Sequence, residues 1–177
     1  RYIRAHASDF NIDPGHIAIL GESASGQMVT QVAALPCLGN PHSDDPVERE
    51  SCQVQAVVSF YGVYNFLPMV KDASPRSLAR RLFARSSLDD ETRAILRQYS
   101  PYYQVRPELP PILLINGTNE YLWEQAVAYV ERLNGAGVDH ALIKLNGAPH
   151  GMEQWEGRPE WQFYKQEMVD WLDATLR

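Results

Sequence analysis

Residues 16–28, HIAILGESASGQM, decide how the chain is expected to fold. An apolar segment over 16–20 favours a short buried strand, and Gly21 follows it directly. Residues 27–35 contain no Gly or Pro and predict a helix. Ser23 therefore lies in a strand-to-helix turn, either as an exposed nucleophile or as one more small residue between two packed elements.

The turn around Ser23 departs at one position from the usual nucleophile pattern, G-x-S-x-G. Gly21 fits this pattern, whereas Ser25 stands where the second Gly is expected and Gly26 follows it. Such a turn brings the residues on either side of the serine close together, so their side chains must be small. The turn would also direct the amide of Ala24, at a helix N-terminus, toward an oxyanion.

The rest of the chain alternates between strand-like and helix-like segments. Further strands are expected over 54–61, 110–118 and 140–147, and helices over 122–137 and from Pro159 onward. A short helix fits 1–10, and the Pro-interrupted residues 63–108 predict a cap-like helical excursion with two helices joined by a polar turn. The alternation predicts one α/β domain over 1–177, with a parallel sheet covered by helices on both faces.

Composition and charge narrow the classes of function. The 177 residues fit one domain, 45% of them are hydrophobic and 21% are charged, and no apolar run approaches the roughly 18 residues that a membrane helix needs. We therefore expect a soluble protein without a membrane span. The net charge of −6 comes from dispersed acidic groups, so a nucleic acid is not an expected partner.

The N-terminus and the cysteines leave the compartment open. The chain begins Arg-Tyr-Ile-Arg, with neither an initiator Met nor a charged-then-apolar leader, so we expect no targeting segment within it. A piece of a longer protein would begin in the same way. Cys37 and Cys52 flank a polar loop, and either a disulfide or two buried thiols fits them.

Three candidate catalytic residues follow predicted strands. Ser23 comes after the first strand, Glu120 after the third and His150 after the fourth. Because functional groups gather at the carboxyl ends of parallel strands, these side chains are expected at one edge of the sheet. A serine hydroxyl needs a neutral imidazole to accept its proton, and the imidazole needs a carboxylate to fix its tautomer. The order Ser, acid, His is that of the α/β-hydrolase arrangement.

Each of the three residues also has an ordinary explanation by itself. Small-residue turns with a serine occur by chance, a loop histidine can lack a function, and a single glutamate is most often a surface carboxylate. Their joint occurrence in the required order, each after a strand, favours the catalytic interpretation. No cluster of His, Cys or carboxylates has metal-ligand spacing, so no metal or cofactor is expected.

Four stretches of the chain can be compared with a known family: IDPGHIAILGESASGQM, YSPYYQVRPELPPILLINGT, EQAVAYVERLNGAGVDH and LNGAPHGM. They resemble the second half of bacterial α/β-hydrolase esterases, the group that includes acetyl esterases, hormone-sensitive-lipase-like enzymes and feruloyl or acetylxylan esterases. The resemblance covers nearly the whole chain and is weakest over residues 36–100. It implies that Ser23 is the nucleophile, His150 the general base and Ala24 an oxyanion donor.

The acid and the N-terminal part depart from this family. Its members usually have His-Gly-Thr-x-Asp after the strand, whereas this chain has Asn116 for the His and Glu120 for the Asp. Asn119 carries no charge and Asp139 precedes the last strand, so Glu120 is the preferred acid. Members also carry, upstream of the nucleophile, about half of their sheet and an H-G-G type loop with the second oxyanion amide. This chain has no such loop. We therefore expect a fragment of a longer esterase, lacking the N-terminal strands, or an unfamiliar arrangement at the edge of the sheet.

The sequence predicts a serine hydrolase that cleaves carboxylic esters through an acyl-enzyme, with short acyl groups or esterified polysaccharides as substrates. A prolyl-oligopeptidase-type peptidase and a non-catalytic α/β-hydrolase-fold binding module remain alternatives. Aromatic residues near the strand ends either pack the core or line a pocket for the acyl or leaving group. The residues considered for this pocket are Glu22, Tyr61, Tyr121 and Trp155.

Overall fold

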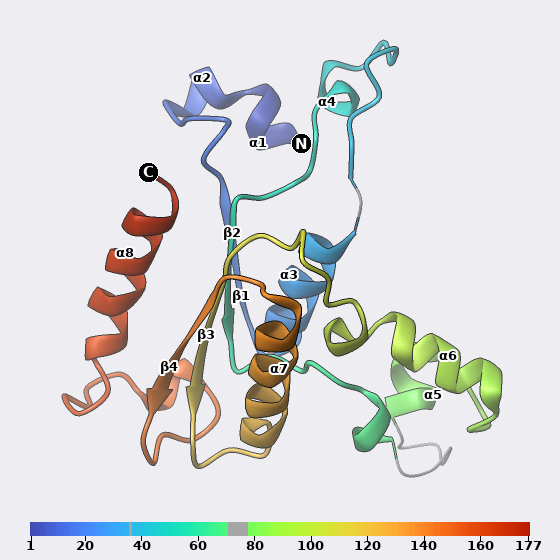
Figure 1. The fold of residues 1–177 in the computed structure, drawn as a ribbon, viewed down its shortest axis with the longest axis vertical. Coiled ribbons are helices and arrows are strands. Elements are labelled where there is room, and N and C mark those ends of the chain that lie inside the picture. Colours follow the sequence, from blue (N-terminus) through green and yellow to red (C-terminus); the bar gives the residue numbers. More distant parts are fainter. Residues whose placement is uncertain (36, 71–77) are drawn as a thin grey trace.

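The computed structural model describes residues 1–35, 37–70 and 78–177. Its centre is a sheet of four parallel strands in the order β1-β2-β3-β4 (Figure 1). The strands are β1 (Ala18–Glu22), β2 (Ala56–Phe60), β3 (Ile112–Gly117) and β4 (His140–Leu145). Val58 of β2 lies beside Leu20 of β1 and Leu113 of β3, so the strands run in step and their carboxyl ends meet at one edge. The predicted parallel sheet is confirmed.

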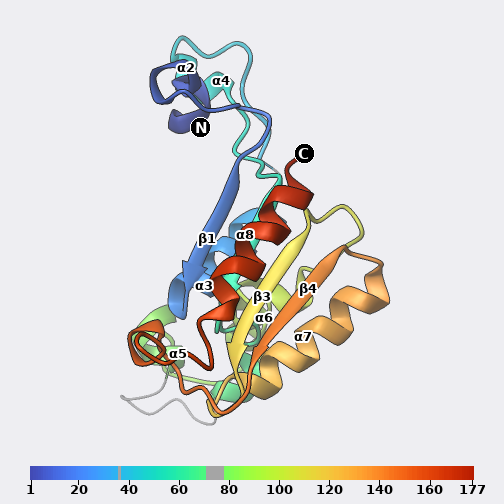
Figure 2. The ribbon, with the colours of Figure 1, turned by 90° about the vertical axis from the view of Figure 1, so that its left-hand side faces the viewer.

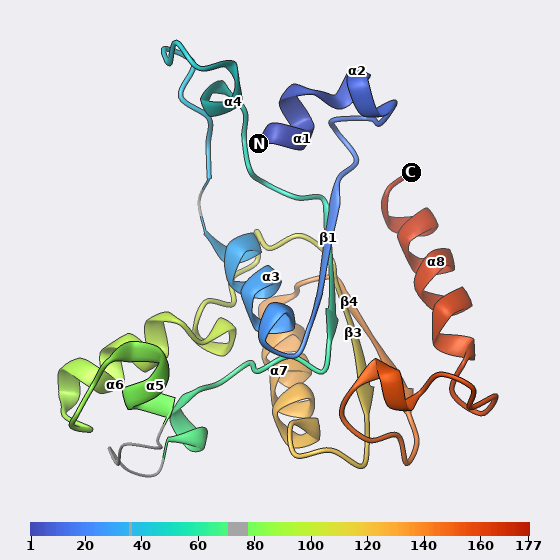
Figure 3. The ribbon, with the colours of Figure 1, turned by 180° about the vertical axis from the view of Figure 1, so that it is seen from behind.

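Helices cover both faces of the sheet, as predicted. α3 (Ala24–Ala34) and α7 (Trp123–Ala136) lie on one face, and α8 (Phe163–Thr175) lies on the other (Figure 1 and Figure 3). Because side chains alternate along a strand, Val57 packs in the cluster beneath α3 and α7, whereas Val58 packs in the cluster beneath α8. Burial on both faces accounts for the continuous apolar runs in β2 and β3, whose residues are all buried.

The bounds of β1 and α3 differ from the predicted strand over 16–20 and the predicted helix over 27–35. The strand extends to Glu22 and the helix starts at Ala24, so only Ser23 separates them. The first turn of the helix packs tightly on β2, since a Cβ on Gly26 would lie 2.9 Å from the carbonyl oxygen of Phe60. Gly26, which the sequence placed just before the predicted helix, is therefore what lets the helix begin so close to the sheet.

Residues 63–108 contain two helices, as predicted, and 71–77 of this segment lie outside the described residues. The helices are α5 (Leu78–Phe83) and α6 (Asp90–Gln98), with 3₁₀ turns at Leu67–Met69 and Pro101–Tyr103. In Figure 1 these two helices lie to the right of α3, toward the carboxyl ends of the strands. The amide of Gln27 in α3 donates to the carbonyl of Tyr99 (2.8 Å), and Gln31 donates to the last carbonyl of α6 (3.1 Å). The excursion is therefore attached to α3, and its role as a cap stays a prediction.

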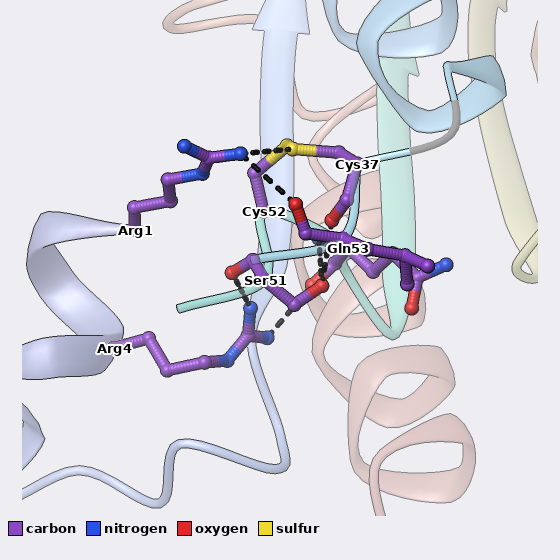
Figure 4. Close-up of a disulfide and its surroundings, with 7 residues drawn as sticks. Arg1, Arg4, Cys37, Ser51, Cys52 and Gln53 are labelled. Atoms are coloured by element: carbon purple, nitrogen blue, oxygen red, sulfur yellow. Dashed lines mark hydrogen bonds between the residues drawn. A yellow bond between two sulfur atoms is a disulfide. The ribbon is translucent and has the colours of Figure 1, made fainter. Parts of the chain in front are cut away.

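A small N-terminal unit lies near the amino ends of the strands. The helix expected over 1–10 is divided into α1 (Tyr2–Ala5) and α2 (Ala7–Phe10), and Figure 2 shows both beside α4 (Pro46–Arg49). Cys37 and Cys52 form a disulfide, which decides between the two alternatives that the sequence left open (Figure 4). Arg4 donates to the carbonyl of Ser51, so α1 is held against the segment that carries the disulfide.

β1 lies at an edge of the sheet. Among the described residues it pairs with β2 alone, and Leu20 is 59% exposed. This agrees with the open edge that the resemblance implied. Within the same three described ranges, no helix has the length and apolar character needed to cross a membrane.

Candidate active site

Ser23 occupies the sharp turn between β1 and α3. Its backbone has φ 50° and ψ −114°. Such a conformation costs a non-glycine residue about 1–3 kcal/mol and persists only where its surroundings impose it. The Ser23 N–H donates to the carbonyl of Phe60 (2.9 Å), which continues the β1–β2 ladder into the turn. A Cβ on Gly21 would lie 2.5 Å from the carbonyl oxygen of Ser25, so the turn requires glycine at position 21. Ser25 itself is exposed, so there is room for its side chain at the position where the G-x-S-x-G pattern has a glycine.

The hydroxyl of Ser23 faces an imidazole that in turn faces a carboxylate. Ser23 Oγ lies 3.0 Å from Nε2 of His150, and Nδ1 of His150 lies 2.6 Å from Oε2 of Glu120. The Glu120 side chain is fully buried, and the His150 side chain is 26% exposed. Because an ionised carboxylate only accepts hydrogen bonds, Nδ1 carries the proton and Nε2 is left to accept from the serine. The structure thus brings together the three residues that the sequence singled out, in a hydrogen-bonded relay.

The loops after β3 and β4 lie against each other, which places the acid beside the histidine. The N–H of Asn119 donates to the carbonyl of Ala148 (3.0 Å), and a Cβ on Gly117 would collide with the same carbonyl oxygen. Gly117 therefore allows the close approach of the two loops. Asp139 lies at the start of β4, at the opposite end of the sheet, in agreement with the choice of Glu120 as the acid.

Glu120 has a second hydrogen-bond partner, which the sequence did not indicate. Nδ2 of Asn116, in β3, donates to Oε1 of Glu120 (2.8 Å). Each oxygen of the buried carboxylate therefore accepts from one side chain, Asn116 or His150. Asn116 is fully buried, and its Oδ1 has no hydrogen-bond partner within the described part of the chain. The signal for this role was the replacement of the family's usual His by Asn at position 116.

Ala24 is the first residue of α3, directly after Ser23. Its N–H is one of the N-terminal amides for which a helix provides no acceptor of its own. This position suits the predicted oxyanion donor, and the assignment stays a prediction. In the ranges that the structure describes, no group of three or more His, Cys, Asp or Glu side chains is placed to hold a metal ion.

The aromatic residues considered for a substrate pocket lie in different surroundings. Tyr121 is 70% exposed and its ring centroid lies 5.2 Å from that of His150, so it borders the candidate catalytic side chains. Trp155 is fully buried, packs edge-to-face on Tyr61 with centroids 5.1 Å apart, and donates from Nε1 to the carbonyl of Pro149 (2.8 Å). The burial of Trp155 favours a packing role over the predicted contact with substrate.

Glu22 and Tyr61, the other two pocket candidates, contact each other. Tyr61 is buried and Glu22 is exposed. The Tyr61 hydroxyl donates to the Glu22 carboxylate. The pKa of Tyr61 is raised above its ordinary value, mainly by burial and to a smaller extent by this hydrogen bond, so the hydroxyl keeps its proton. The sequence placed both residues near the site but did not indicate this bond.

Comparison with known proteins identifies the family. A family model described as BD-FAE matches residues 1–131. The chain belongs to the BD-FAE family. The matched part of this BD-FAE chain includes Ser23 and Glu120, and His150 lies beyond it.

The BD-FAE chain is also similar to individual esterases. It is 31% identical to the Probable carboxylic ester hydrolase LipM of Mycobacterium tuberculosis over 137 residues, which are 75% of this chain and 31% of LipM. It is 26% identical to Est2, an esterase of Thermogutta terrifontis solved with propionate bound, with a TM-score of 0.68 over 96% of this chain and 59% of that chain.

A further likeness concerns the fold alone. The acetyl ester-xyloside bifunctional hydrolase of Caldicellulosiruptor lactoaceticus matches the BD-FAE chain with a TM-score of 0.81 and 23% identity, over 98% of this chain and 61% of that one. These comparisons confirm the predicted α/β-hydrolase fold and the predicted resemblance to esterases. The chain spans only 31–40% of the length of the curated relatives it matches.

Proposed function

We propose that this chain carries the catalytic residues of a serine esterase that cleaves carboxylic esters through an acyl-enzyme. The observation that carries the proposal is the relay, with 3.0 Å between Ser23 Oγ and His150 Nε2 and 2.6 Å between His150 Nδ1 and Glu120 Oε2. The carboxylic ester hydrolase named among its relatives supports the choice of an ester over another acyl compound.

The geometry supports a two-stage reaction. In the first stage Nε2 of His150 takes the Ser23 proton, and Oγ attacks the ester carbonyl. Glu120 stabilises the imidazolium that forms, while the Ala24 amide donates to the oxyanion. His150 then protonates the leaving alcohol. In the second stage His150 accepts a proton from a water molecule, which attacks the acyl carbon. The bond from that carbon to Ser23 Oγ then breaks, His150 returns the proton to Oγ, and the carboxylic acid is released.

We propose esters of short acyl groups as the substrates, with esterified polysaccharides in the same class. The propionate bound to the Thermogutta terrifontis esterase supports a small acyl group. Tyr121, exposed beside His150, is the pocket candidate best placed to contact the substrate. A second oxyanion donor is expected from an H-G-G type loop, which the 177 residues do not contain.

The proposal is tested by hydrolysis of p-nitrophenyl acetate and butyrate. Turnover is expected for the parent chain and for Ser25→Ala, and it is expected to vanish in Ser23→Ala, with circular dichroism showing that all three fold. A Pro-containing anilide cleaved faster than both esters would favour the peptidase alternative. If the parent folds without turnover, the same assay on a chain extended at its N-terminus follows. No turnover there would overturn the proposal and favour the binding module.

A further inference from the structure

Tyr61 has an unusual backbone directly after β2. Its φ is 36°, in the left-handed region that non-glycine residues seldom adopt, and its side chain is 1% exposed. Its N–H donates to the carbonyl of Ile115 (2.9 Å), which keeps the residue in the β2–β3 ladder. Such a conformation persists only where the surrounding structure imposes it.

The hydroxyl of Tyr61 joins the two turns that carry the serine and the histidine. It donates to the carboxylate of Glu22, the residue directly before Ser23. It also accepts from the N–H of Met152 (2.9 Å), two residues after His150. One oxygen atom therefore bonds to both segments that must meet for the Ser23–His150 hydrogen bond to form.

The ring of Tyr61 supports the imidazole itself. It packs against His150 with ring centroids 4.6 Å apart and planes at 60°. The Tyr61 ring also packs against the indole of Trp155. Nε1 of Trp155 donates to the carbonyl of Pro149, the residue before His150. The segment around His150 is thus held by the ring of Tyr61, by the hydroxyl of Tyr61 and by the indole of Trp155.

We propose that Tyr61 is a positioning residue that fixes His150 relative to Ser23, with Glu22 as its anchor. The inference rests on the proposed esterase function and replaces the substrate-pocket role considered for these two residues. A pocket residue acts on substrate binding and therefore on KM. A residue that aligns the base with the nucleophile acts on the chemical step and therefore on kcat.

The chain offers a matched pair of variants, Tyr61→Phe and Tyr64→Phe. Both tyrosines follow β2, both are buried and both hydroxyls are hydrogen-bonded, but Tyr64 bonds to Ser59 (2.9 Å) and stacks on Tyr129. Tyr61→Phe is expected to lower kcat for p-nitrophenyl acetate by about 10- to 100-fold, with KM unchanged within about twofold. Tyr64→Phe is expected to change kcat by less than about threefold.

A proton NMR measurement gives a readout that does not depend on turnover. The Nδ1 proton between His150 and Glu120, in a 2.6 Å hydrogen bond, is expected as a sharp downfield signal in the parent and in Tyr64→Phe. It is expected to broaden or vanish in Tyr61→Phe, because a loosened histidine exchanges that proton with water. If neither the parent nor the N-terminally extended chain hydrolyses an ester, the proposed function fails, and this signal still decides the role of Tyr61.

Variants at the exposed anchor keep the inference testable if Tyr61→Phe does not fold. Glu22→Leu removes the acceptor and is expected to reproduce the loss of kcat, and Glu22→Gln, which keeps an acceptor oxygen, is expected to restore most of it. Equal effects of Tyr61→Phe and Tyr64→Phe on kcat and on the downfield signal would overturn the inference. So would a change confined to KM.

Discussion

Replacing Asn116 by leucine is expected to separate catalysis from stability. Asn116 donates to the buried Oε1 of Glu120 at 2.8 Å, while its own Oδ1 is buried without a partner in the described ranges. Leucine has a similar shape and removes both polar atoms. The lost bond to a carboxylate is worth about 1.5–3 kcal/mol, and removing an unpaired buried oxygen returns about 1–3 kcal/mol. The two largely cancel, so the free energy of unfolding should change by no more than about 2 kcal/mol.

The catalytic rate has no such compensation. In the proposed mechanism, the bond from Asn116 orients the carboxylate that stabilises the His150 imidazolium in the transition state. A loss of about 1.5–3 kcal/mol there corresponds to a fall in kcat of about 10- to 150-fold, since about 1.4 kcal/mol is one factor of ten.

The assay compares kcat for p-nitrophenyl acetate with urea unfolding in the parent, Asn116→Leu and Asn119→Leu. Asn119 is exposed in the same loop, so Asn119→Leu makes the same chemical change away from the carboxylate. A fall in kcat of less than about threefold in Asn116→Leu would refute the reasoning. An equal fall in both variants would do the same.

Three further predictions concern the turn, the disulfide and the excursion. Gly21→Ala should lower both kcat and the thermal midpoint, because its Cβ would lie 2.5 Å from the Ser25 carbonyl oxygen and overpacking costs about 1–3 kcal/mol; a parental midpoint would contradict this. Reducing the disulfide, whose cysteines are 15 residues apart, should lower the free energy of unfolding by about 3 kcal/mol while ester hydrolysis continues, as urea unfolding with and without dithiothreitol can show. Hydrogen bonds from Ser87 and then from the α6 backbone lower the pKa of Asp89 from 3.8 to about 2. Its contribution to stability is therefore present above about pH 4 and lost as the pH falls toward 2, so Asp89→Asn should flatten the drop in thermal midpoint over that interval.

The relay could be predicted because each of its residues follows a continuous apolar run. Such runs indicate strands buried on both faces, and a parallel sheet of those strands brings the residues after them to one edge. Ser23, Glu120 and His150 needed no knowledge of side-chain orientation to be placed there. The bounds of β1 were harder, because Gly21 and Glu22 look like turn residues although they pair with Ser59 and Phe60.

What the sequence could not settle depends on contacts between distant residues. Two cysteines around a polar loop fit a disulfide and free thiols equally, and only their Cα separation of 5.3 Å decides. Trp155 is an aromatic residue near a strand end, which fits a substrate pocket and the core alike, and only its burial in the structure favours the core. The bond between Glu22 and Tyr61 joins residues 39 positions apart, which no local pattern indicates.

The attachment of the excursion to α3 has a consequence for how such a chain can diversify. Gln27 and Gln31 hold the end of α6 on α3, the helix that starts directly after Ser23, so the excursion and the candidate nucleophile are attached to the same helix. The connection between α5 and α6 lies at the other end of that excursion. In the predicted cap role, insertions and substitutions in this connection would change the access of substrates to the strand ends, while the two glutamines keep α6 attached to α3. Under the proposed function, selection would then act on substrate preference and on the alignment of Ser23 as two separate traits.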